Sequence, residues 1–342
     1  MGNGAQRNFL YVKLFVSVRV RSCSFVVDVY RRSLPPPYAP YLFSVACCLL
    51  LVSAPVFGSE RSTGADFLRI EPSAQAAAMG GGFGALADDV HALYYNPAGI
   101  SLVGKTQLTA THAEWLAGLQ KEYVAIAFPL GSMGWGIGGT FLHSEETERD
   151  DKGRPLSTFM VGDGALTAGI GIRLTDRHHL GAAAKFLTRT LYHRSATGYA
   201  MDLGYQFRHQ SGHGHLWNAG LVIKNIGPDI GFTYKEKLPT EIEASVAYQP
   251  SLWLRRPLTV TFGVRSGAFL DGIHALFGVQ GTILGRFHLR AGYVASAEAA
   301  EKLRAGFGID LFEMGHIDFA AVRIGRFNSS LFLSLTLQVG KK

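Results

Sequence analysis

The chain has 342 residues and a formal net charge of +7, but six of its 33 basic residues and only one of its 26 acidic residues precede position 59. The remainder carries a net charge of +2, which gives no case for nucleic-acid binding. All three cysteines, Cys23, Cys47 and Cys48, also precede position 59, which excludes disulfides and thiol chemistry from the rest of the chain.

The N-terminal residues 1–58 have the pattern of a leader. Residues 41–54 form an apolar run that follows two arginines and has the length of a signal-peptide core. The run is too short to span a membrane comfortably as a helix. We therefore predict a leader over residues 1–58 and cleavage before Ser59. Within the leader, we interpret residues 1–40 as sequence upstream of the true start of the protein.

Residues 64–100 form the long part of the mature chain that lacks strand alternation. Small helix formers at 74–79 are followed by glycines that end the helix. Two aspartates favour a second short helix, and an Asn-Pro-Ala-Gly turn, whose glycine permits a positive φ, closes the segment. The other interpretation of this segment is a poorly ordered extension with a turn. The residues that define it are Gly80, Gly81, Gly82, Asp88, Asp89, Asn96, Pro97, Ala98 and Gly99.

This segment resembles the N-terminal signature of the PorV/PorQ family, part of the wider FadL-like group of outer-membrane β-barrels. The matching residues are 65–70, 76–81, 85–89 and 94–99. The resemblance implies a helical hatch, or plug, at residues 59–104 that sits inside the barrel and leads into the first strand. It identifies a family and not a transported molecule.

From position 105 to 342 the pattern becomes period two, with apolar residues on one face and small or polar residues on the other. A soluble β-sandwich would give the same alternation. Three features favour a transmembrane antiparallel β-barrel: segments of about ten residues, a secretion signal, and aromatic residues near strand ends. Strands in lipid cannot leave an open edge, so the sheet is expected to close.

We predict about 14 strands, an even number as such barrels require. Both termini are then expected on the periplasmic side of the outer membrane of a diderm bacterium, with charged residues 142–157 and residues 226–239 in external connections. The predicted strands are 105–116, 121–129, 134–143, 159–174, 178–192, 197–209, 215–225, 240–249, 256–265, 272–283, 286–294, 301–311, 315–324 and 329–339.

If the apolar faces meet lipid, a set of charged residues points into the lumen. One interpretation is a network of ion pairs that braces the plug, and the other is a polar conduit or ligand surface. The predicted lumen-facing residues are Lys185, Arg189, Asp202, Arg208, Lys224, Glu243, Arg265, Arg290, Arg304 and Asp310.

No arrangement of residues indicates an enzyme, a cofactor or a catalytic site. His209, His213 and His215 could bind a metal, but a solvated turn explains them better, so no metal site is predicted. Resemblance to PorV/PorQ implies assistance to protein export of the type IX secretion kind, with secreted cargo or secretion components as partners. The alternative is a FadL-like gated channel for hydrophobic small molecules.

Overall fold

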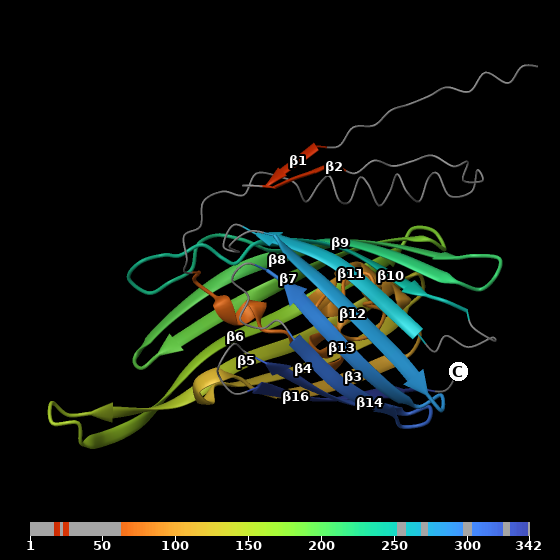
Figure 1. The fold of residues 1–342 in the computed structure, drawn as a ribbon. Coiled ribbons are helices and arrows are strands. Elements are labelled where there is room, and N and C mark those ends of the chain that lie inside the picture. The colour runs from red at the N-terminus through yellow and green to blue at the C-terminus, as the bar shows by residue number, and fades with distance from the viewer. Residues whose placement is uncertain are drawn as a thin grey trace, which may run out of the picture. The chain divides into compact units, whose positions relative to one another are not determined.

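The structure, a computed structural model, describes residues 17–20, 23–26, 63–251, 258–267, 273–296, 303–323 and 329–340. Within residues 63–340, fourteen strands close into one barrel (Figure 1). Every neighbouring pair is antiparallel, and the last strand pairs with the first to complete the ring. The predicted fold class, a transmembrane antiparallel barrel with a short helical plug, is confirmed.

The barrel strands follow one another around the wall in chain order. They are β3 (Thr106–Glu114), β4 (Gln120–Leu130), β5 (Met133–Arg149), β6 (Pro155–Arg173), β7 (His178–Leu191), β8 (Arg194–Gln210), β9 (Leu216–Ile226), β10 (Glu241–Gln249), β11 (Leu258–Gly267), β12 (His274–Ile283), β13 (Phe287–Ala295), β14 (Leu303–Asp310), β15 (Gly315–Arg323) and β16 (Ser329–Val339).

The two ends of the barrel differ in their connections. At the end where β3 begins and β16 finishes, called the turn end here, several connections are short: 131–132, 174–177, 211–215, 284–286 and 311–314. The opposite end, the loop end, carries the 14-residue connection 227–240 between β9 and β10. The predicted alternation of short and long connections holds in part, because the two-residue connection 192–193 lies at the loop end.

The alternation of side chains along each strand follows the predicted facing. On β16, Leu333 is 51% exposed on the outer face, whereas its neighbour Ser334 is fully buried inside. On β8, Leu203 faces outward and Asp202 is fully buried. Because the side-chain period of a strand is two, one residue of slippage would exchange these faces, so the register is strongly specified.

Residues 142–157, predicted to be a charged external loop, are mostly strand. β5 and β6 continue past their neighbours as a two-stranded ribbon that projects from the barrel (yellow in Figure 1). At its tip, Asp150 accepts hydrogen bonds from the backbone N–H groups of Arg154 (2.8 Å) and Lys152 (2.9 Å). The hydrogen bond from the Arg154 backbone is the main reason that the pKa of Asp150 lies below its ordinary value. The alternating pattern was missed there because residues 143–151 are polar on both faces of the ribbon.

A separate unit of the chain, residues 1–44, contains a two-stranded antiparallel sheet of β1 (Ser17–Val20) and β2 (Cys23–Val26). The predicted apolar core at 41–54 and the cleavage point before Ser59 lie outside the described residues. Within the described ranges, no helix combines the length and the apolar character needed to cross a membrane.

A charge at mid-strand should be far more damaging than the same charge at the strand end. We expect Leu333→Arg to lower the free energy of unfolding from lipid vesicles by about 2–4 kcal/mol, because the guanidinium would face hydrocarbon. Val339→Arg, on the same face of β16 but at its turn end, should cost roughly 0–1 kcal/mol. Denaturant titration, read as the electrophoretic shift of the folded barrel, measures both. Equal losses would contradict the assigned facing.

Candidate functional site

The candidate site is the hatch, residues 63–103, together with the inward face of the wall. The hatch contains two short 3-10 helices, η2 (Asp66–Arg69) and η3 (Pro97–Leu102), and two short α-helices, α2 (Ala74–Ala78) and α3 (Ala92–Tyr95). It lies inside the barrel (orange in Figure 1). Its first residues are at the loop end, where the backbone N–H of Gly64 donates to Lys237 O (3.0 Å) in the β9–β10 connection. The hatch therefore runs from the loop end to the turn end, a course that the sequence did not predict.

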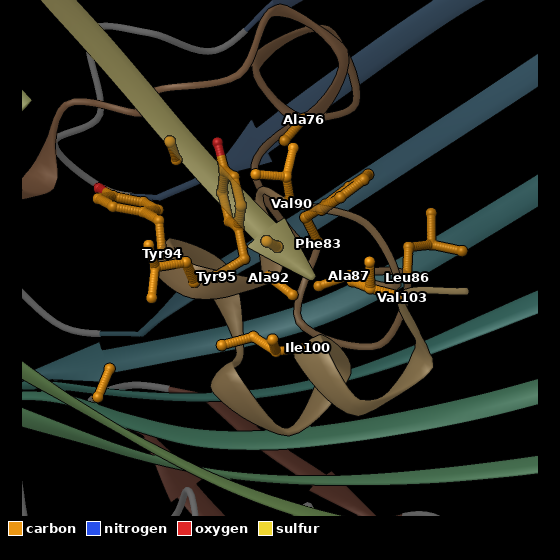
Figure 2. Packing of buried hydrophobic residues seen from close by; sticks show 14 of the residues in the cluster. Ala76, Phe83, Leu86, Ala87, Val90, Ala92, Tyr94, Tyr95, Ile100 and Val103 are labelled. Carbon is orange, nitrogen blue, oxygen red and sulfur yellow. The ribbon is translucent and has the colours of Figure 1, made fainter. Parts of the chain in front are cut away.

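The hatch has an apolar core of its own, which it shares with small wall residues. Phe83 packs edge-on against Tyr95, with ring centroids 5.2 Å apart, and Val90 and Ile100 lie beside them (Figure 2). The wall contributes small or aromatic side chains, Tyr123, Ala125, Ala127, Ala183 and Ala247. Because this core is shared, folding of the hatch depends on the closed wall.

The predicted helix and its glycine break are present. Ser73 caps α2, with its Oγ accepting from the Ala76 backbone N–H (3.4 Å). Gly80 and Gly81 have φ values of 79° and 77°, a conformation that favours glycine. Gly82 follows them and lies against the wall at Gly263.

The predicted turn at Asn96 is held by one amide side chain. Asn96 Oδ1 accepts from the Ala98 backbone N–H (3.2 Å), and Asn96 Nδ2 donates to Gly84 O and Tyr205 O, both at 3.0 Å. Asn96 thus joins the turn to another part of the hatch and to the wall. Pro97 begins η3, a position where its missing N–H is not needed.

One detail of this region differs from the expectation. Gly99 lies within η3 and is not among the residues with positive φ. A side chain there would overlap with Ala87 O, so close approach explains this glycine. The expected second helix is present: α3 begins at Ala92, whose backbone N–H donates to Asp89 O (3.0 Å). Asp89 also pairs with His91 (2.9 Å), and Asp88 pairs with Arg208 (3.2 Å).

The wall is fitted to the hatch by glycines. At seven wall positions an added Cβ would come within 3.2 Å of a hatch backbone atom, so the hatch backbone lies directly on the strands there. We call this set the glycine seat: Gly134, Gly171, Gly181, Gly204, Gly220, Gly278 and Gly292. The close fit leaves no gap between hatch and wall at these positions.

The remaining strands also contact the hatch, so it touches all fourteen. The seat covers β5, β6, β7, β8, β9, β12 and β13. Contacts from the other seven are Thr109 to His91, Lys121 to Ile70 O, Glu243 to Gly84 N, Arg265 to Gly81 O, Arg304 to Glu71, Ala320 to the α2 alanines, and Ser334 to Ala74 N.

The predicted lumen-facing charges form ion pairs across the interior. Lys185 Nζ lies 2.7 Å from both Asp202 Oδ2 and Asn225 Oδ1, and all three residues are buried. Other pairs are Arg189 with Asp163 (3.2 Å), Lys224 with Glu241 (3.5 Å), Arg265 with Glu243 (2.9 Å), Arg290 with Asp318, Arg304 with Glu71 (2.9 Å) and Asp310 with His288 (3.0 Å). The pair of Arg304 with Glu71, and that of Arg208 with Asp88, link wall to hatch as the bracing interpretation requires. A role in conduction stays a prediction.

The sequence reasoning missed Lys121 and the aromatic ring that it faces. Tyr94 of the hatch lies among three lysines, whose Nζ atoms are 5.4–5.9 Å from its ring centroid: Lys121, Lys185 and Lys224. Tyr94 Oη donates to Leu68 O (2.7 Å). Lys121 lies on the same face of β4 as Tyr123 and Ala125, so the alternation of side chains along β4 could have identified it as lumen-facing.

An apolar cluster lies in the lumen at the loop end, beside this charged layer. It joins the first part of the hatch to β6, β7, β8 and the β9–β10 connection. We call it the loop-end cluster: Phe67, Leu68, Ala165, Leu187, Ala200, Ile230 and Leu238, with Leu142 and Ala196 packed against it.

The candidate metal histidines do not form a site within the described residues, where no group of three or more His, Asp or Glu side chains is arranged to hold a metal ion. His215 Nδ1 instead accepts from the Ser251 backbone N–H (3.1 Å). His178 and His179 face opposite ways, with His178 bonded to Tyr205 Oη (2.8 Å) and His179 to Ser101 Oγ (2.8 Å).

No protein-family model and no curated protein matches the chain. Among solved structures, it is similar to a deltaS2 mutant of the TodX monoaromatic hydrocarbon channel, with 12% identity, 78% of this chain and 96% of that chain covered, and a TM-score of 0.51. The CymD monoaromatic hydrocarbon channel has 12% identity, coverage of 80% and 98%, and a TM-score of 0.50. A FadL homologue from Pseudomonas aeruginosa has a TM-score of 0.44, which is too low to add to the argument. At these identities the likeness shows the fold alone.

The glycine seat should be sensitive to single methyl groups. In Gly278→Ala, the new Cβ would overlap with Met79 O and Thr261 Oγ1, and overpacking of this kind costs roughly 1–3 kcal/mol. We expect a lower midpoint of thermal unfolding and a larger ion leak in planar bilayers. Gly281→Ala, on the same strand, has open space around its Cβ and should behave as wild type. The same leak and midpoint in both variants would contradict the tight seating of the hatch.

Proposed function

We propose that this protein is an outer-membrane channel that admits small hydrophobic molecules from the loop end. The observation that carries this proposal is the loop-end cluster, a group of buried apolar side chains in the lumen beside the charged layer. A hydrophobic molecule transferred from water to such a surface gains about 25 cal/mol per Å² of buried apolar area. The fold shared with two hydrocarbon channels supports the same substrate class.

The hatch argues against an open aqueous pore. It touches every strand, and its backbone rests on the glycine seat. Passage therefore requires part of the hatch to move. Phe67 and Leu68 occupy the loop-end cluster themselves, so an incoming apolar molecule would compete with these two side chains for the same contacts.

The orientation that fits this proposal places the turn end in the periplasm, because outer-membrane barrels have short periplasmic turns and longer external loops. The C-terminal end of β16 then lies on the periplasmic side, and the start of the hatch at Gly64 lies toward the outside. The projecting ribbon of β5 and β6 would reach into the medium.

Assistance to protein export is the second candidate. The motif resemblance of residues 64–100 to the PorV/PorQ family is the observation that favours it, and no contact among the described residues adds to it. The two hydrocarbon channels support uptake of a small solute instead. Comparing secreted proteins between a deletion strain and its parent tests export directly, and an unchanged set would remove this candidate.

The uptake proposal is tested by making the loop-end cluster polar. Leu187 is fully buried in this cluster, and Leu187→Asn removes a side chain whose burial contributes about 1.5–3 kcal/mol. We expect uptake of radiolabelled toluene, in cells that lack their own hydrophobic-compound channels, to fall roughly tenfold or more. Folding of the variant is checked by its electrophoretic shift.

The matched control is Leu191→Asn, at the end of the same strand, where the leucine is 46% exposed. It should leave toluene uptake unchanged. Uptake that is equal in wild type and Leu187→Asn, or no uptake above that of cells without the protein, would contradict the proposal.

A further inference from the structure

The outer face of β7–β10 carries a band of rings at the turn end, which we call the His-aromatic collar. Its members are His178, Tyr205, Phe207, His209, His215, Trp217 and Tyr248. His178 and Phe207 have ring centroids 5.2 Å apart, and Trp217 and Tyr248 are 4.2 Å apart. His209 is the register partner of Trp217, so the band is continuous across four strands.

Aromatic rings at this depth are ordinary in a membrane barrel, where they lie at the level of the lipid headgroups. Histidine side chains differ from these rings, because each imidazole adds a hydrogen-bond donor and a titratable group at the level of the headgroups. His215 Nδ1 accepts from the Ser251 backbone N–H (3.1 Å), so its neutral form carries the proton on Nε2. His178 Nδ1 is bonded to Tyr205 Oη (2.8 Å), which fixes the plane of this ring as well.

The connection that precedes the collar carries an arginine and an aspartate. Arg177 is exposed next to His178 in the β6–β7 connection, and its backbone carbonyl accepts from the Arg208 backbone N–H (2.8 Å), which ties this connection to β8. Asp176, also exposed, is the acidic neighbour in the same connection.

The outer face near the loop end carries acidic and basic groups together. Glu114, Glu145, Arg149 and Arg323 are exposed there, and Glu122 pairs with His112 (2.7 Å) on the outside of β3 and β4. The three imidazoles of the collar lie at the turn end instead, so lipid headgroups at that level would meet their N–H donors.

We propose that the His-aromatic collar, with Arg177, binds the phosphate of an anionic glycerophospholipid in the leaflet at the turn end. The guanidinium and the imidazole N–H groups are donors suited to phosphate oxygens. The rings of Trp217 and Tyr248 supply the apolar surface on which the glycerol and upper acyl chain rest. The bound lipid is one partner of defined chemistry, distinct from any solute that enters the lumen.

Quenching of tryptophan fluorescence by brominated lipids tests this proposal, because Trp217 lies within the collar. Trp135 lies at the same end of the barrel, on the outer face of β5 and outside the collar, and serves as the matched reporter. In single-tryptophan proteins, Trp217 should be quenched by brominated phosphatidylglycerol about fivefold more effectively than by brominated phosphatidylcholine, which corresponds to about 1 kcal/mol near a basic residue. Trp135 should show no preference.

The triple variant Arg177→Gln, His178→Phe, His215→Phe keeps the rings and removes the donors. It should abolish the preference at Trp217 while leaving the signal at Trp135 unchanged, which also reports that the barrel has inserted. Equal preference at both tryptophans of the otherwise unchanged protein would overturn the proposal, as would a preference at Trp217 that survives the triple variant.

Discussion

A closed barrel of fourteen strands encloses more space than its inward side chains can fill, and this constraint governs the rest of the structure. The hatch fills that space. The wall accepts it by reducing seven inward positions to glycine, so that strand and hatch backbones approach directly. Such a fit gains packing at the cost of side-chain volume. Barrel and hatch therefore specify one another.

The charged groups inside the barrel impose a second constraint: each must have a partner, since an unpaired buried charge costs several kcal/mol. Ion pairs inside the barrel satisfy this constraint, as in Lys185 with Asp202 and Arg304 with Glu71. The second of these pairs joins wall to hatch, so the charges act as fixed contacts for the plug. Lys121 differs, because its Nζ donates to the hatch carbonyls of Phe67 and Ile70. It also faces the Tyr94 ring at 5.5 Å, so all of these contacts depend on the course of the hatch.

The sequence predicted the barrel because period-two alternation is a local signal that survives without tertiary information. It predicted the direction of Asp202 and Leu203 for the same reason. The course of the hatch could not be predicted from the sequence, because no pattern in residues 64–100 indicates that the chain enters at the loop end and leaves at the turn end. The partners of Arg304 and Lys185 depend on that course and on register between distant strands. The role of Gly99 was misjudged because a close approach to Ala87 leaves no trace in a local pattern.

The two halves of the hatch are held by different contacts. The second half, from Ala78 to Ser101, lies on glycines of seven strands, where its backbone leaves no room for a wall side chain. The part at the loop end is held by side-chain contacts, such as Arg69 with Glu241 (3.5 Å) and Phe67 with the loop-end cluster. An apolar molecule could take the place of Phe67 in this cluster, whereas Arg69 and Glu241 would need water or another charged partner. In the proposed channel, a molecule that enters at the loop end meets Phe67 and Leu68 before the residues on the glycine seat.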